Sequence, residues 1–171
     1  MKNISTRDIT LIAVFGVLLT LQEELLAFIP NVSLTVFLIV LYSKVFGTKR
    51  TLLILVIHVA LDNFIMGNMS PIFVPCMYVG WALIPILLNT VFKNASKTIH
   101  LALLGAMFSF LYCWIYIVPA HYAMGVSYSA YILSDILFEV ILAVSSFLSI
   151  LWLYDPCYRI LSNLYNERTQ S

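Results

Sequence analysis

The chain has 171 residues, of which 62% are apolar and only 10% are charged. Soluble domains are typically about 45–50% apolar and about 25% charged, and a chain of this length cannot enclose so much apolar side chain in an interior. The net charge of +1 also argues against a disordered chain and against a nucleic-acid-binding protein, because both need many charged residues. The composition therefore predicts a single integral membrane domain over residues 1–171, embedded in the lipid bilayer, with no room for a soluble catalytic domain.

Apolar stretches suited to membrane helices recur along the whole chain. The first follows Lys2 and Arg7 as a signal peptide would, but no small-residue cleavage site follows it, so we expect a retained helix. Pro30, Gly47 and the Asp155-Pro156 pair mark breaks between or after stretches. The pattern predicts an all-α membrane protein with six transmembrane helices at about 9–29, 33–46, 51–67, 72–92, 98–118 and 129–154, and a short amphipathic tail after the last.

The basic residues predict the orientation of these spans. In the six-span arrangement all nine fall on one side of the membrane, at the two termini and in or beside the second and fourth connections: Lys2, Arg7, Lys44, Lys49, Arg50, Lys93, Lys97, Arg159 and Arg168. Cytoplasmic loops carry an excess of Lys and Arg. We therefore expect both termini in the cytoplasm and a multi-pass protein of the plasma membrane.

Most of the carboxylates lie inside the spans, away from every Lys and Arg. These five are Glu23, Glu24, Asp62, Asp135 and Glu139. A carboxylate at the centre of a membrane helix costs about 2.5–3.5 kcal/mol, so such groups should face a bundle interior or a wet cavity. Asp135 and Glu139 are four residues apart and share one helix face. His58 and Asp62 have the same spacing, which predicts a His–carboxylate pair that is either structural or part of a cavity wall.

These residues predict an outward-facing cavity for a small molecule. Carboxylates without basic neighbours favour a ligand that carries a positive charge or many N–H donors. Trp81 and Trp114 lie inside spans and could stack on a flat ring, although an interfacial aromatic belt would also explain them. Cys76, Cys113 and Cys157 show no metal-binding spacing, so we expect no metal and no cofactor. The candidate substrate-binding residues are Glu24, His58, Asp62, Asn63, Trp81, Tyr112, Trp114, Asp135 and Glu139.

One stretch has a distinctive order of punctuating residues. From residue 29 to residue 68 it reads IPNVSLTVFLIVLYSKVFGTKRTLLILVIHVALDNFIMGN. It contains Ile-Pro with a polar turn, a short apolar helix, Phe-Gly with a basic pair, and a helix ending in Asp-Asn before a Gly-containing loop. This order resembles the substrate-binding (S) components of energy-coupling factor (ECF) transporters, which are small six-helix vitamin-capture proteins of bacteria and archaea.

The resemblance implies a transport mechanism. Such a component binds a vitamin or related nutrient from outside, associates with a transmembrane coupling protein and two cytoplasmic ATPase subunits, and reorients in the bilayer to release its load. Small residues of the first span face the coupling protein in that family. The matching residues here are Ala13, Gly16 and Thr20, with Val17 where a second alanine is expected. The charge pattern favours a thiamine-related compound or an amine-bearing deazapurine, and riboflavin, folate, biotin, pantothenate and cobalamin stay open.

Three other functions compete with transport. A structural membrane scaffold of the cell-shape type would explain the topology but not the five unpaired acids. An intramembrane enzyme would need catalytic residues, and the sequence has no HExxH, GxSxG, P-loop or GxGxxG motif. A channel would need a ring of acids, which single acids on an asymmetric chain do not form. We therefore expect a transporter component and not an enzyme.

Overall fold

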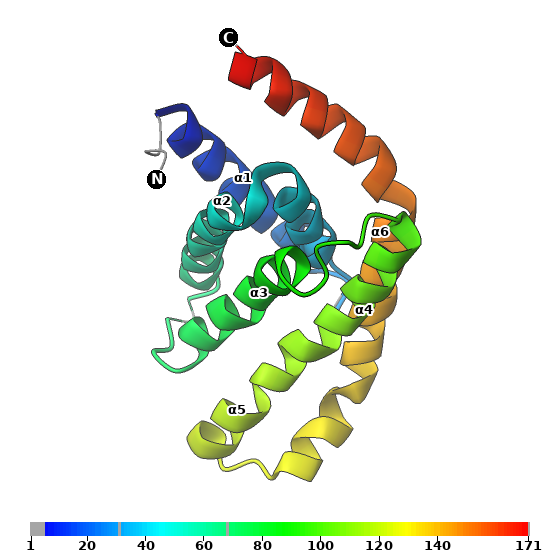
Figure 1. The fold of residues 1–171 in the computed structure, drawn as a ribbon. Helices are drawn as coiled ribbons and strands as arrows, with labels where there is room; N and C mark the ends of the chain where they lie inside the picture. The colour runs from blue at the N-terminus through cyan, green and yellow to red at the C-terminus, as the bar shows by residue number, and fades with distance from the viewer. Residues whose placement is uncertain (1–5, 31, 68, 171) are drawn as a thin grey trace.

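The computed structural model describes residues 6–30, 32–67 and 69–170, and over these residues the chain forms helices and no strand. The elements are α1 (Thr6–Leu26), α2 (Thr35–Ile65), α3 (Phe73–Asn89), α4 (Thr98–Ile115), α5 (Ile117–Met124) and α6 (Tyr128–Gln170) (Figure 1). The predicted all-α class is therefore confirmed. By length and composition α1, α4 with α5, and α6 could each cross a membrane, and α3 is a shorter apolar helix.

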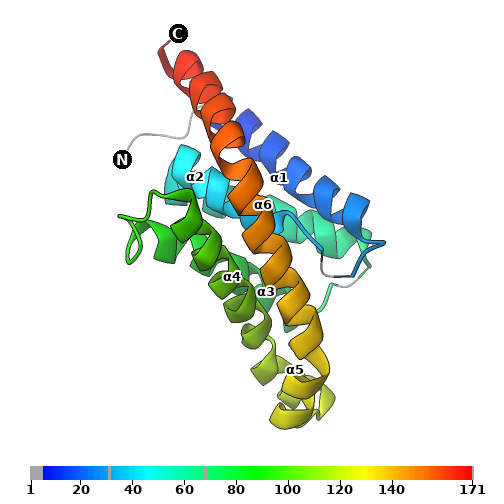
Figure 2. The ribbon, with the colours of Figure 1, turned by 90° about the vertical axis from the view of Figure 1, so that its right-hand side faces the viewer.

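α2 consists of two helical arms that meet at Gly47. This residue has φ 78° and ψ 169°, a backbone region that is essentially restricted to glycine. The sequence analysis places a break at the same residue, between the stretches 33–46 and 51–67, and this break is confirmed. Because of the bend, α2 lies between α1 and α3 and also contacts α4 and α6 (Figures 1 and 2).

Small side chains allow the helices to approach closely, as is common in membranes. Gly16 of α1 packs against Ile57 of α2, where a Cβ atom would lie 2.7 Å from the Ile57 Cγ2 atom. Between α4 and α6, the buried Ser109 hydroxyl donates a hydrogen bond of 2.9 Å to Ser146. The helix packing therefore depends on glycine and serine at these contacts as well as on large apolar residues.

The C-terminal half differs from the sequence analysis in two places. Pro119 lies in the first turn of α5, so the predicted outer connection is largely helical. The prediction that Asp155-Pro156 ends the last helix is wrong, because α6 continues through Pro156 to Gln170. Figures 1 and 2 show that the C-terminal part of α6 leans back towards the start of α1.

The segments that carry the basic residues meet at this end of the molecule. Arg50, just after the bend of α2, donates to the Asp8 carboxylate of α1 at 2.7 Å, and this hydrogen bond raises the pKa of Arg50. The Arg50 guanidinium also lies 5.8 Å from the ring centre of Tyr165 on α6. At the start of α4, Thr98 donates to Asp155 of α6 at 2.7 Å. The starts of α1 and α4, the bend and the end of α6 are thus held together.

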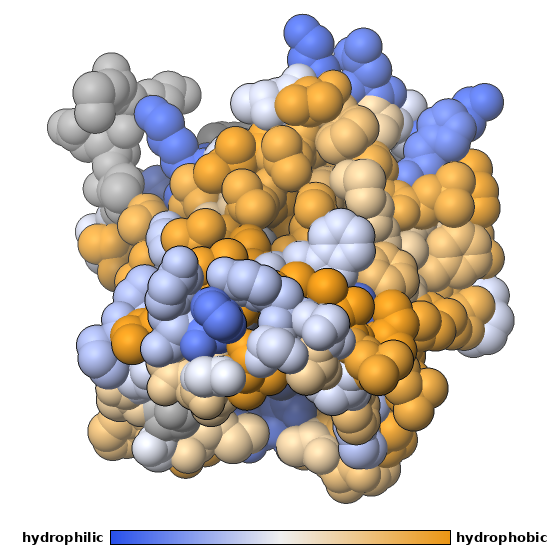
Figure 3. Space-filling model, turned by 90° about the horizontal axis from the view of Figure 1, so that it is seen from below, coloured by the Kyte–Doolittle hydropathy of each residue, from blue (hydrophilic) through white to orange (hydrophobic). Residues whose placement is uncertain are grey.

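The opposite end of the molecule carries α5 and the start of α6 (Figures 1 and 2). Figure 3 views the molecule from this end. Most of the surface in this view is hydrophobic, and a hydrophilic patch interrupts it near the centre. The hydrophilic side chains seen at this end are therefore gathered in one patch within a largely apolar surface.

Candidate functional site

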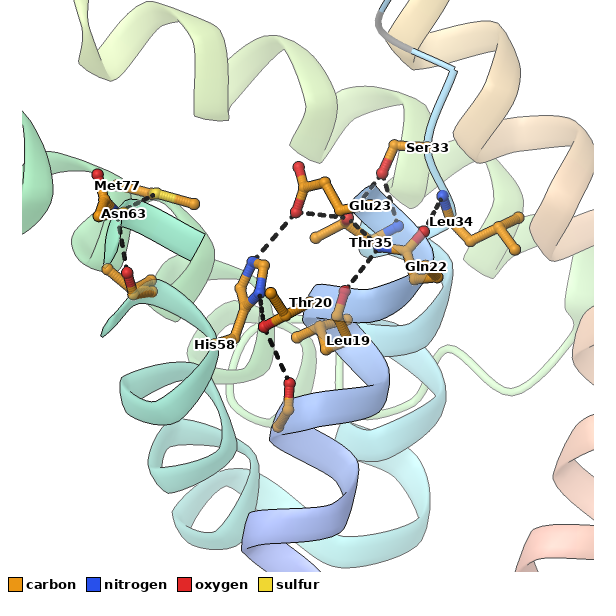
Figure 4. Close-up of polar contacts among 12 residues, drawn as sticks. Leu19, Thr20, Gln22, Glu23, Ser33, Leu34, Thr35, His58, Asn63 and Met77 are labelled. Atoms are coloured by element: carbon orange, nitrogen blue, oxygen red, sulfur yellow. Dashed lines mark hydrogen bonds and ion pairs between the residues drawn. The ribbon is translucent and has the colours of Figure 1, made fainter. Parts of the chain in front are cut away.

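His58, on the second arm of α2, lies at the centre of a buried polar cluster between α1 and α2 (Figure 4). Its side chain has no exposed surface. Its Nδ1 atom lies 3.2 Å from the Thr20 Oγ1 atom, and its Nε2 atom lies 3.3 Å from the Glu23 Oε2 atom. Thr20 and Glu23 are three residues apart on α1 and so share one helix face. One face of α1 therefore supplies both groups that hold the imidazole.

The hydrogen bonds of this cluster indicate that the Nδ1 atom of His58 carries a proton. The Thr20 hydroxyl donates to the Gly16 carbonyl oxygen at 3.2 Å. A hydroxyl has a single proton, so in this arrangement the His58 Nδ1–H donates to Thr20. The buried Nε2 atom forms no hydrogen bond among the described residues, although the Glu23 Oε2 atom lies 3.3 Å from it. Nε2 is therefore the ring atom of His58 that is left without a hydrogen bond among the described residues.

Two further carboxylates lie beside this pair. Glu23, Glu24 and Asp62 are close enough to one another for their charges to repel. Thr35 donates to the Glu23 Oε2 atom at 3.4 Å, whereas the buried Glu24 Oε1 atom has no hydrogen-bond partner among the described residues. The ion pairs formed within that part of the chain join no Lys or Arg to these three acids. The cluster is therefore a concentrated acidic site with one imidazole.

A network at the connection between α1 and α2 fixes the position of Thr35. The Gln22 amide nitrogen donates to the Thr35 hydroxyl at 2.7 Å, and the Gln22 amide oxygen accepts from the Leu34 N–H at 2.9 Å. Ser33 is held from α6, because the Ser145 hydroxyl accepts from the Ser33 N–H at 3.2 Å and donates to the Ser33 carbonyl oxygen at 3.1 Å. Hydrogen bonds from α1 and from α6 therefore fix the backbone beside the acidic site.

An aromatic wall from α3 and α4 lies next to the acids. Trp81 is buried and stacks on Tyr112, with ring centres 3.6 Å apart and an interplanar angle of 12°. The Tyr112 and Tyr116 hydroxyl groups are 3.0 Å apart, and both lie close enough to Glu23 to sense its charge. Because Trp81 stacks on Tyr112, one face of each ring already has a partner within the protein.

The other predicted acids lie elsewhere, between α4 and α6. Glu139 is fully buried, and the Trp114 indole N–H donates to its Oε2 atom at 3.2 Å. Asp135 is half-buried on the same face of α6. Trp114 is 50% exposed, so it is not the enclosed stacking surface that the sequence analysis expects. The predicted site residues thus form two separate groups, one around His58 and one around Glu139.

Two details of the predicted site differ in the structure. His58 does not pair with Asp62 on its own helix, because its two ring nitrogens face Thr20 and Glu23 of α1. Asn63 is buried, and its amide nitrogen donates to the Val59 carbonyl oxygen at 2.8 Å and to the Met77 sulfur at 3.2 Å (Figure 4). Asn63 therefore links the second arm of α2 to α3.

The three residues predicted to face a coupling protein lie on different sides of α1. Ala13 is exposed, next to the exposed Val14 and Val17. Gly16 and Thr20 are buried against α2. Close packing of Gly16 against Ile57 and the contact of Thr20 with His58 explain this burial. Of the three, only Ala13 is on a face that another protein could reach.

Sequence reasoning missed two residues of this cluster. Glu23 is counted among the intramembrane acids but not among the candidate substrate-binding residues. Thr20 is assigned to the face that docks a coupling protein, whereas in the structure it contacts His58, as Glu23 does. A signal was present in the sequence, because Gly16, Thr20 and Glu23 recur at helical spacing and place a small residue, a hydroxyl and a carboxylate on one face. The spacing does not show that α2 packs against this face of α1.

A separate groove runs along the outside of α6. It has a volume of about 530 Å³, and its lining is almost entirely apolar, including Val32, Leu34, Val140, Val144 and Trp152. An apolar groove on a helix of this length suits the hydrocarbon chains of a bilayer. It offers no charged group and is distinct from the acidic cluster around His58.

Comparisons with known proteins matched this chain to no protein-family model, no curated protein and no solved structure. The resemblance to ECF S components therefore rests on the order of residues in the stretch 29–68 and on the hydropathy of the chain.

Proposed function

We propose that this chain is a six-span protein of the plasma membrane of a bacterium or archaeon, with both termini in the cytoplasm. In this arrangement the two arms of α2 are separate spans, and α3 completes the set with α1, α4 and α6. The contacts of Arg50 with Asp8 and Tyr165 support it, because they gather the basic segments on one side, as the positive-inside rule requires. Lys2, which belongs to the same side, lies outside the described residues.

We propose further that the protein is the substrate-capture subunit of an ECF-type importer and not an enzyme. The observation that carries this proposal is the group formed by Glu23, Glu24 and Asp62, in which Glu23 contacts the buried His58 and no ion pair among the described residues joins an acid to Lys or Arg. Uncompensated carboxylates in a membrane helix are costly unless they serve a bound group. A ligand with a positive charge or several N–H donors would compensate them, and the Tyr112 and Tyr116 hydroxyls would add polar contacts.

The partners follow from the resemblance. A transmembrane coupling protein and two cytoplasmic ATPase subunits would drive release, and the exposed side of α1 around Ala13 is the proposed docking face for the coupling protein. Substitution of Ala13 by leucine should then impair uptake while ligand binding stays intact. Undisturbed co-purification with the coupling protein would remove this part of the proposal.

Mass spectrometry of small molecules that co-purify with the protein tests the proposal directly. Purified protein is then titrated with thiamine, a cation, and with pantothenate, an anion. We expect retention of a cationic or donor-rich heterocycle, and thiamine should bind more tightly than pantothenate. Protein that retains no small molecule and binds neither probe would favour a structural scaffold instead. Intact binding with loss of a chemical activity in a His58 variant would favour an intramembrane enzyme.

Charge-neutralising variants identify the residues that bind. Glu23→Gln and Asp62→Asn should each weaken ligand binding at least about tenfold, which corresponds to about 1.4 kcal/mol. Glu167→Gln is the matched control, because this carboxylate is exposed at the other end of the molecule. Equal affinity in all three variants and the unmodified protein would show that the ligand does not bind at the His58 cluster.

A further inference from the structure

Three potential metal ligands meet between α4 and α6. Cys113 of α4 and Asp135 and Glu139 of α6 each offer one sulfur or oxygen atom, and these three atoms lie within 4.8 Å of one another. Cys113 and Glu139 are buried and Asp135 is half-buried. The sequence analysis expects no metal site, because Cys76, Cys113 and Cys157 show no metal-binding spacing.

Helix packing brings these residues together. Asp135 and Glu139 are four residues apart, so both project from one face of α6. One turn from Cys113 along α4, the hydrogen bond from Ser109 to Ser146 fixes α4 against α6. The three groups therefore converge from two helices that are held in register by a buried polar contact.

The Glu139 side chain gives an independent sign that a ligand belongs here. It has no exposed surface, and the Trp114 N–H holds its Oε2 atom at 3.2 Å. Its Oε1 atom is buried and has no hydrogen-bond partner among the described residues. Buried polar atoms normally have partners, and metal-binding side chains are commonly oriented by a hydrogen bond to the other atom of the group. Glu139 shows both features.

The charges at this place call for a cation. Two carboxylates on one helix face repel each other, and the ion pairs formed within the described residues join neither of them to Lys or Arg. In a membrane span this excess of negative charge is costly. A divalent cation would neutralise both carboxylates at once.

We propose that Cys113, Asp135 and Glu139 form a binding site for a divalent metal ion of the zinc type. One thiolate and two carboxylates match the ligands that Zn²⁺ accepts, whereas Mg²⁺ and Ca²⁺ prefer oxygen ligands alone. In a tetrahedral zinc site neighbouring ligand atoms are roughly 3.6 Å apart, so small side-chain rotations close the present separation. As the metal–sulfur bond forms, the Cys113 thiol proton leaves to water, and the fourth position stays open for water or a ligand atom. The site does not depend on the proposed transport function.

Cobalt titration of the full-length, untagged protein in detergent tests the proposal, because a Co²⁺–thiolate bond has a characteristic charge-transfer absorption. After treatment with a chelator, the protein should bind about one Co²⁺ with this absorption, and Zn²⁺ should displace it. Cys113→Ser should abolish the absorption. Cys76→Ser is the matched control, because Cys76 lies on α3 outside the cluster, and it should leave the absorption unchanged.

Two milder variants keep the test decisive if Cys113→Ser fails to fold. Asp135→Asn and Glu139→Gln should keep the thiolate absorption but weaken Co²⁺ binding at least about tenfold. The proposal is overturned if the unmodified protein shows no thiolate absorption, if the absorption disappears with Cys76→Ser instead, or if both amide variants bind Co²⁺ as tightly as the unmodified protein.

Discussion

Replacement of Gly16 by alanine should destabilise the protein and disturb the His58 site. The added Cβ atom would lie 2.7 Å from the Ile57 Cγ2 atom and 2.8 Å from its Cβ atom, whereas carbon atoms normally pack at about 3.5–4.0 Å. The Ile57 Cβ atom is attached to the backbone, so α1 and α2 must move apart by roughly 1 Å. Overpacking costs about 1–3 kcal/mol, and alanine returns about 0.5–1 kcal/mol of helix propensity. We expect a net loss of about 1–2 kcal/mol.

Thermal unfolding of the purified protein measures this loss. For a chain of this size each 1 kcal/mol shifts the midpoint by about 2–4 °C, so Gly16→Ala should lower it by about 2–8 °C. Moving α1 away from α2 would also lengthen the contacts of His58 with Thr20 and Glu23. Thiamine binding should therefore weaken in the same variant that loses stability. Ala13→Val is the control, because it enlarges an exposed position of the same helix. A Gly16→Ala protein as stable as the unmodified one would refute the close contact between α1 and α2.

Three further predictions concern the fold. Gly47→Ala should cost about 1–3 kcal/mol, because its backbone conformation suits glycine alone, and the thermal midpoint should fall accordingly. A double-mutant cycle with Ser109→Ala and Ser146→Ala should give a coupling energy of about 0.6 kcal/mol, and a value of zero would contradict their hydrogen bond. Asp8→Asn should cost less than about 1 kcal/mol, since its ion pair with Arg50 is partly exposed, and high salt should erase the difference in midpoint.

The helices and their main break could be predicted from the sequence for simple physical reasons. Apolar stretches bounded by proline, glycine or charged residues leave few alternatives to membrane helices. Gly47 stands between two such stretches, and the bend occurs there. The end of α6 could not be predicted in this way, because Pro156 removes one backbone hydrogen bond but the helix continues on both sides of it.

The unusual residues of the candidate site can be found in the sequence, but their pairings cannot. Acids inside spans are unusual in any packing arrangement, and Glu24 is near enough to Asp62 to affect it electrostatically. Spacing within one helix suggested that His58 pairs with Asp62, but such spacing shows only which residues share a face. The residue opposite that face depends on how α1 packs against α2. In this packing Glu23 of α1 contacts the His58 imidazole. The separation of the Glu139 group from the His58 group likewise depends on tertiary packing.

The placement of α1 has a mechanical consequence. One side of this helix, around Ala13, is exposed, while Thr20 and Glu23 on its other side contact the His58 imidazole of α2. A partner bound at the Ala13 side would be separated from the contacts with His58 only by the thickness of a single helix, about 10 Å. A neighbour that tilts α1 would therefore loosen the acidic site directly, without any relay through the remaining helices.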